Sequence, residues 1–176
     1  MPPACLPVFL GSVAAVVICG LGLIAWLVIQ RAPPLTRDGF DRARRIWTQV
    51  RPGSYRVQTT VTGRQGATYL VEVRDGVPVS AARNGNPLPQ ERVWRTWTVD
   101  GMFDTMHADV RMRERREKTQ DFSLPDLILR AEFDPTSGIP RRYVRIDRRS
   151  PLDVTWRIDS FENLSGPPTP SDAIQR

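Results

Sequence analysis

The chain has 176 residues, of which 40% are hydrophobic, and its 25 Lys and Arg against 19 Asp and Glu give a formal net charge of +6. This length holds one folded domain beside an apolar segment, which excludes a multidomain enzyme and a polytopic transporter. Hydrophobic residues are concentrated before residue 30. The remainder is about one-third apolar, which is enough for a modest core and too much for wholesale disorder.

The first feature along the chain is the apolar, uncharged run of residues 6–29, which as a helix would extend about 36 Å and cross a bilayer. We predict a single transmembrane helix here, after an N-terminal tail of residues 1–5. A cleaved signal peptide or a lipoprotein is the alternative. Against it, no basic segment precedes the run, no small-residue cleavage site is found, and the run continues well beyond Cys19.

The orientation of this helix follows from the charges beside it. No Lys or Arg precedes it, whereas several arginines, beginning at Arg31, follow it closely, and the positive-inside rule then places the domain in the cytoplasm. Both cysteines, Cys5 and Cys19, lie in or beside the apolar run. The domain therefore has no internal disulfide, and cysteine usage does not identify the compartment.

The rest of the chain predicts an α+β domain over residues 38–161. Adjacent prolines in residues 30–37 predict a short stiff linker, and the polar, proline-rich residues 162–176 predict a disordered tail. Apolar residues at helical spacing predict two helices, one over 40–50 and one over 99–116. Thr98 and Asp100 are the candidate N-caps of the second helix, and Pro52-Gly53 ends the first.

Alternating apolar residues predict the strands of an antiparallel sheet, with the helices packed on one face. These strands are expected at residues 55–61, 67–73, 77–81, 127–133, 144–146 and 154–158. Turns are expected at Asp75-Gly76 and Asn84-Gly85, and a proline-bearing loop at 86–92. In the turn from Asp134 to Gly138, the aspartate caps the backbone and the glycine takes a positive φ.

This last hairpin also carries a resemblance. The motifs Phe133-Asp134, Gly138-Ile139-Pro140 and Val144-Arg145-Ile146-Asp147, with the segment Thr98 to Phe103 upstream, are similar to a bacterial family of exported, membrane- or lipid-anchored domains of unknown function. That family typically shows Tyr-Asp, Gly-Tyr-Pro and Ile-x-Ile-Asp; here Phe133 and Ile139 replace its tyrosines. The resemblance covers roughly residues 40–161 and implies a fold and export from the cytoplasm, against the positive-inside count, but no chemistry.

Few catalytic chemistries are compatible with the composition. His107 is the single histidine and the domain has no cysteine, so thiol catalysis and Cys/His zinc sites are excluded and a Ser-His-Asp triad would depend on His107. The acidic loop of a calcium site and the lysine of a phosphate loop are absent. No reader motif for nucleic acid accompanies the positive charge. We therefore predict no metal site, no cofactor and no nucleic-acid partner.

The candidate binding residues are basic. Five arginines surround the last hairpin, and with those of residues 111–116 they predict a surface for anionic lipid headgroups, or for an acidic protein or polymer; solvated faces with local ion pairs are the alternative. The five are Arg141, Arg142, Arg145, Arg148 and Arg149. Asp134 and Gly138 are candidates for a loop that contacts a ligand, the alternative being a purely structural turn.

These observations favour a membrane-anchored, non-catalytic binding module. An inhibitor-like protein that blocks a partner enzyme is one alternative, for which Trp94 and Trp97 would lie in an exposed apolar patch instead of the core. An enzyme that uses carboxylates and arginines is another, and it would gather at least two carboxylates in one pocket.

Overall fold

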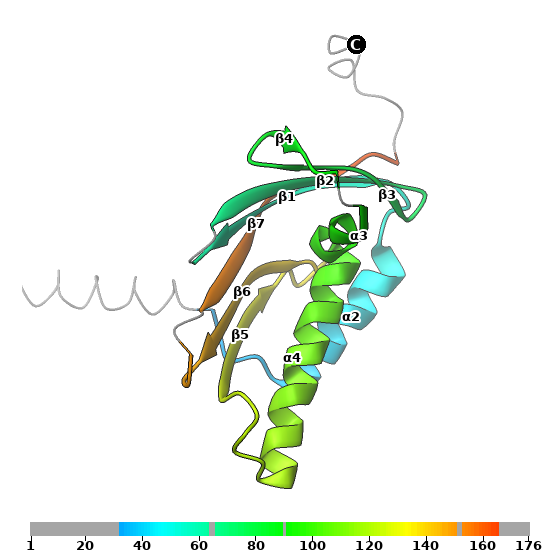
Figure 1. Ribbon diagram of the computed structural model, residues 1–176. Helices are drawn as coiled ribbons and strands as arrows, with labels where there is room; N and C mark the ends of the chain where they lie inside the picture. The colour runs from blue at the N-terminus through cyan, green and yellow to red at the C-terminus, as the bar shows by residue number, and fades with distance from the viewer. Residues whose placement is uncertain (1–31, 64–65, 90, 151–152, 166–176) are drawn as a thin grey trace, which may run out of the picture. The chain divides into compact units, whose positions relative to one another are not determined.

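The computed structural model describes residues 32–63, 66–89, 91–150 and 153–165 (Figure 1). The predicted N-terminal tail and transmembrane helix, residues 1–29, lie outside the described residues, as does most of the predicted C-terminal tail. No helix in the described part of the chain is long and apolar enough to cross a membrane.

One seven-stranded antiparallel sheet forms the larger layer of the domain, in the order β4-β3-β2-β1-β7-β6-β5 (Figure 1). Its strands are Tyr55–Thr62 (β1), Ala67–Arg74 (β2), Val77–Arg83 (β3), Asn86–Pro87 (β4), Leu127–Phe133 (β5), Pro140–Asp147 (β6) and Val154–Asn163 (β7). The two halves of the sheet meet where the first long strand, β1, pairs with the last, β7. Pairing between the two ends of the domain sequence therefore makes the sheet continuous.

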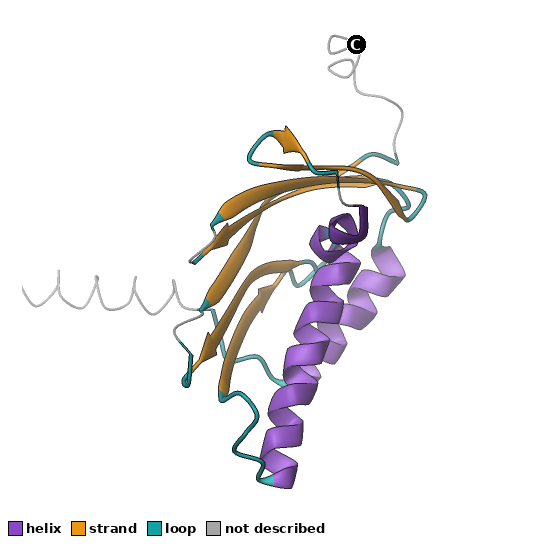
Figure 2. Cartoon of the chain, viewed as in Figure 1, coloured by secondary structure: helices purple, strands orange, loops and turns teal. Residues whose placement is uncertain are grey.

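Two helices, Arg37–Val50 (α2) and Val99–Thr119 (α4), lie side by side against one face of the sheet (Figure 2). Both begin at a threonine N-cap, because the hydroxyls of Thr36 and Thr98 accept hydrogen bonds from the amides of Gly39 and Gly101, each at 3.1 Å. The predicted α+β class, with an antiparallel sheet and two helices on one face, is confirmed.

The core lies between these two layers. Alternate residues of the long strands and one stripe of each helix meet there, and removal of their apolar surface from water is the main source of stability. The largest fully buried side chains include Phe40, Trp47, Met102, Phe103, Met106, Val57, Val71, Leu129 and Tyr143. Most of the apolar residues that recur at helix and strand spacing in the sequence thus lie on these buried faces.

The described part of the predicted linker, residues 30–37, is not a free spacer. The amide of Leu35 donates to the carbonyl of Leu129 (2.9 Å), the amide of Ala131 donates to the carbonyl of Pro33 (3.0 Å), and the Leu35 side chain is buried in the core. The physical reason is that β5 is an edge strand, whose outward N–H and C=O groups need partners. The linker covers this edge.

The predicted tail, residues 162–176, also begins too early. Strand β7 continues to Asn163, which pairs with Tyr55, and the amide of Leu164 donates to the carbonyl of Ser54 (2.9 Å). The polar sequence at the end of β7 is compatible with a strand because β1 supplies the backbone hydrogen-bond partners.

The predicted loop 86–92 contains short ordered elements. β4 lies in it, and a helical turn, Glu91–Trp94 (α3), continues into the 3-10 turn Arg95–Trp97 (η1) that leads into α4. Such short elements show no periodicity by which they would be predicted.

Candidate functional site

A cavity of about 330 Å³ lies between α4, η1 and the strands β6 and β7. It is lined by Thr96, Trp97, Met102, Thr105, Asp109, Tyr143, Arg145, Val154 and Trp156. The sheet register creates its floor, because Tyr143 pairs with Trp156 and Arg145 pairs with Val154. All four side chains therefore project from the same face of the sheet, toward α4. The volume falls at the lower end of the range for small-molecule sites.

The polar end of the cavity is a three-residue network between α4 and β6. The Tyr143 hydroxyl donates to Asp109 Oδ2 at 2.7 Å, and Arg145 Nε donates to Asp109 Oδ1 at 3.1 Å. The Asp109 and Arg145 side chains are only 13% and 23% exposed. Burial, and then the negative charge of Asp109, raise the pKa of Tyr143, so the phenol stays protonated. Each carboxylate oxygen of Asp109 thus has a fixed donor.

The other walls of the cavity are formed mainly by aromatic and aliphatic side chains, with Thr96 and Thr105 among them. The Trp97 ring stacks on Tyr69, with 4.1 Å between ring centroids and 14° between planes. Tyr143 and Trp156 pack with their centroids 5.3 Å apart. Trp97 is therefore held at the cavity by a residue of β2, whereas the indole N–H of Trp94 donates to the carbonyl of Leu88 (2.6 Å) and fixes the loop before α3. The two tryptophans have different surroundings.

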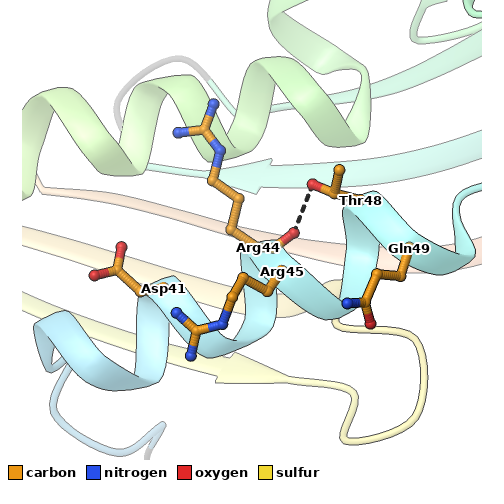
Figure 3. A pocket seen from close by; sticks show the side chains of 5 residues that line it. All are labelled: Asp41, Arg44, Arg45, Thr48 and Gln49. Atoms are coloured by element: carbon orange, nitrogen blue, oxygen red, sulfur yellow. Dashed lines mark hydrogen bonds between the residues drawn. The ribbon is translucent and has the colours of Figure 1, made fainter.

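A second hollow, of about 380 Å³, lies on α2 and is lined by Asp41, Arg44, Arg45, Thr48 and Gln49 (Figure 3). All five lining residues come from one helix. Arg44 points toward α4, where its guanidinium is 3.2 Å from the carboxylate of Asp104, and the Thr48 hydroxyl donates to the carbonyl of Arg44 (2.8 Å). This hollow is an exposed polar helix face, and it lacks the apolar walls of the first cavity.

The five arginines predicted as one basic surface do not lie together. Arg145 faces the cavity. Arg142 lies three positions earlier on β6 and therefore projects from the other face of the sheet. Arg141 forms an ion pair of 2.7 Å with Asp134. The guanidinium of Arg148 lies 3.9 Å from Asp126.

The remaining member of the set, Arg149, holds a loop. Its guanidinium donates to the carbonyl of Phe122, and its backbone amide donates to the side chain of Asp147 (3.1 Å). Arg148 and Arg149 therefore connect the turn after β6 to the loop after α4.

Asp134 and Gly138 form the predicted turn. Asp134 Oδ1 accepts from the amides of Thr136 (3.0 Å) and Ser137 (2.8 Å), and Oδ2 accepts from Arg141. The bond from Arg141, followed by the Ser137 amide, holds the pKa of the Asp134 carboxyl well below its usual range. Gly138 has a φ of +73°. The Asp134 carboxylate is thus occupied by groups of its own hairpin.

His107, the single histidine, stacks on Phe40 with 5.9 Å between ring centroids and 10° between planes. It is partly buried on α4 beside the apolar stripe. Within the described ranges, no group of three or more His, Cys, Asp or Glu side chains is placed to hold a metal ion. The cavity lining contains one carboxylate, that of Asp109.

Two residues of the polar network, Asp109 and Tyr143, are not among the residues predicted from the sequence. The available signals were weak: Asp109 directly precedes Val110 of the apolar stripe of α4, and Tyr143 alternates with Arg145 along β6. Neither signal reveals that the two side chains meet, because α4 and β6 are distant in sequence and come together only in the folded domain.

The fold and the cavity define an α+β domain in which two helices cover one face of an antiparallel sheet, and one of them, α4, borders a small, mainly apolar site with a charged end. No family model matches the chain, and no curated protein matches it. Among solved structures, the crystal structure of MucB is similar at 13% sequence identity and a TM-score of 0.36. The match covers 81% of this chain and 64% of the MucB chain, so this chain spans less than two thirds of that length. A similarity at this level does not define a function.

Proposed function

We propose that this protein is a membrane-tethered, non-catalytic binding module whose cavity takes an apolar group that carries a polar end. The observation that carries the proposal is the cavity itself, in which tryptophan, methionine and valine walls adjoin the Asp109, Tyr143 and Arg145 network. Small-molecule sites usually combine apolar walls with a few convergent polar groups in this way.

The network indicates which polar end would fit. Arg145 uses Nε for Asp109, and its two terminal nitrogens have no hydrogen-bond partner within the described residues. A guanidinium that keeps free donors in a half-buried site favours an acceptor such as a carbonyl or carboxylate oxygen. The apolar part would be a small aromatic or hydrocarbon group, given a volume of about 330 Å³.

The non-catalytic part of the proposal rests on how Asp109 is held. Both of its oxygens accept hydrogen bonds from protein donors, and one of these donors is the cation Arg145. A general base instead directs a lone pair at the substrate, and the bonds that orient Asp109 point its two oxygens at Tyr143 and Arg145. Asp109 is therefore better suited to fixing Arg145 and Tyr143 in place than to moving a proton.

The tether is supported by the uncharged run of residues 6–29, which is long enough to cross a bilayer. The family resemblance implies that the domain is exported, and we adopt this orientation although the arginines after the run favour the cytoplasm. Fusions of alkaline phosphatase and of green fluorescent protein after Arg176 decide between the two. An inactive phosphatase with a fluorescent second fusion would reject export.

The binding function is tested with an aromatic anion, 1-anilinonaphthalene-8-sulfonate, and a chain that begins at Pro33, since the core cluster starts at Leu35. Thr105 lines the cavity from α4, so we expect Thr105→Phe to fill part of it. Thr155→Phe is the matched control, because residue 155 lies between the cavity residues Val154 and Trp156 and faces the other side of the sheet.

We expect the wild-type chain and Thr155→Phe to enhance the dye fluorescence alike, and Thr105→Phe to bind it at least about tenfold more weakly, the equivalent of about 1.4 kcal/mol. Arg145→Gln should weaken binding of this anionic dye and leave binding of an uncharged analogue unchanged. Equal dye affinity in the wild type and Thr105→Phe would reject the cavity as the binding site.

A further inference from the structure

The C-terminal turns of α4 extend beyond the strands β5 and β6 in Figure 1. Their outer face is a stripe of residues spaced three or four apart, opposite the buried Met106 and Val110. Together with the loop after the helix this stripe lines a shallow hollow of about 490 Å³. Its lining residues are Ala108, Arg111, Met112, Glu114, Arg115, Lys118, Thr119 and Leu124.

Three cations of this stripe, Arg111, Arg115 and Lys118, have no carboxylate within salt-bridge distance in the described part of the chain. The one carboxylate in the lining, Glu114, lies 3.4 Å from Arg37 of α2 and is thereby drawn to another helix. Residues 111–121 hold five cations and three carboxylates, so this end of α4 carries a net positive charge, which attracts anionic surfaces.

An exposed aromatic side chain accompanies these cations. Phe122, in the loop directly after α4, is 65% exposed, and Met112 of the stripe is 36% exposed. Two arginines fix the loop. Arg149 donates a hydrogen bond to the Phe122 carbonyl. Arg116 lies over the Phe122 ring at 5.5 Å and forms an ion pair of 3.2 Å with Asp126. The ring is thus held at the surface by specific contacts.

We propose that this face, which we call the α4 tip and define as Arg111, Met112, Arg115, Lys118 and Phe122, docks on anionic phospholipid headgroups of a bilayer. Exposed apolar side chains among basic ones are typical of surfaces that lie in the membrane interface, where the cations meet phosphates and the apolar groups enter the acyl boundary. Cations without fixed partners suit mobile headgroups better than the matched geometry of a protein interface. The proposal is independent of the cavity and its ligand.

The test uses the full chain in lipid nanodiscs with and without an anionic phospholipid. A photoreactive benzoylphenylalanine replaces Phe122, and in a control it replaces Val77, which is 60% exposed at the start of β3. After irradiation, lipid adducts at each position are quantified by mass spectrometry. We expect adducts at position 122 in anionic discs, and few in zwitterionic discs or at position 77.

Charge reversal tests whether the cations of the α4 tip cause the lipid contact at position 122. Each cation near an anionic surface contributes about fivefold to the binding constant, so changing Arg111, Arg115 and Lys118 to Glu should lower the adduct yield at position 122 at least about tenfold. A control with three other exposed arginines, Arg42, Arg45 and Arg83, changed to Glu makes the same change in net charge on other elements and should retain the adducts.

Equal adduct yields in the two disc compositions, or equal losses in the two charge-reversed chains, would overturn the proposal. In a second irradiation, carried out in native membranes, adducts of position 122 with one acidic protein in place of lipid would assign the α4 tip to a protein partner and also overturn the proposal. Whether the chain remains with the membrane after carbonate extraction is scored separately, because it tests the tether and not the α4 tip.

Discussion

Replacement of Gly138 by alanine tests how the last hairpin is joined to the rest of the domain. Gly138 has a φ of +73°, and a Cβ at this position would lie 2.2 Å from the carbonyl oxygen of Ala43 and 2.9 Å from the amide nitrogen of Trp47. Both atoms belong to the backbone of α2, so neither can move aside without shifting the helix. The turn between β5 and β6 therefore packs directly on α2, and only a glycine permits this distance.

Gly76 provides the matched comparison. It has nearly the same φ, +78°, in the turn between β2 and β3, but an added Cβ would meet nothing within 4 Å. Gly76→Ala should cost only the positive-φ penalty, about 1–2 kcal/mol. Gly138→Ala should cost that penalty and a further 1–3 kcal/mol or so for the overpacking against α2. The difference between the two variants isolates the contact of the hairpin with the helix.

The assay is urea unfolding of the chain that begins at Pro33, monitored by tryptophan fluorescence. Trp47 lies at the contact itself and reports on it. We expect the transition midpoint to fall further for Gly138→Ala than for Gly76→Ala at an unchanged m value, which shows that stability has changed and not the extent of unfolding. Equal losses of unfolding free energy in the two variants would refute the close packing of the hairpin on α2.

Three further predictions concern single polar groups. The Thr59 hydroxyl is buried without a hydrogen-bond partner among the described residues, so Thr59→Val should raise the free energy of unfolding by about 1 kcal/mol. Thr60→Val, which loses the hydrogen bonds to Thr68 and Asp159, should lower it by about 1 kcal/mol. Urea unfolding measures both changes. Burial, followed by the charge of Asp100, raises the pKa of Tyr55 to about 12. The unfolded chain loses this proton near pH 10, so stability should fall between about pH 10 and 12, and thermal scans of Tyr55→Phe should lack this part of the fall. The depressed pKa of Asp134 stabilises the fold above about pH 4, and that stability is lost as the pH drops, so an acid titration of Asp134→Asn should show a shallower loss.

The local periodicities of the sequence predict most elements of the domain. Strand β5 has the predicted bounds, and both long helices extend the predicted ranges by only a few residues. Thr98 caps α4 as one of its two candidates, while the other, Asp100, accepts from the indole of Trp47 (3.0 Å). Periodicity succeeds here because each of these segments is apolar on one side and polar on the other.

Strand β6 shows where periodicity alone is insufficient. Its apolar positions Val144 and Ile146 signal a strand, yet the fully buried residue is Tyr143, and Arg145 lies on the same inner face. Both faces of β6 carry mixed residues, so the sequence does not say which one meets the helices. Pairing with Trp156 of β7 and the partly buried carboxylate of Asp109 decide which face turns inward.

The sequence predicts the α+β class, the two long helices, most strands and the turn residues, because these depend on contacts between near neighbours along the chain. It indicated that Gly138 needs a positive φ, but only the tertiary structure shows that α2 leaves no space for a side chain there. The candidate site also arises only on folding, since α4, β6 and β7 each supply part of the cavity. The positive charge was evident from composition, whereas packing and ion pairing decided which cations are engaged and which, on the α4 tip, still face solvent.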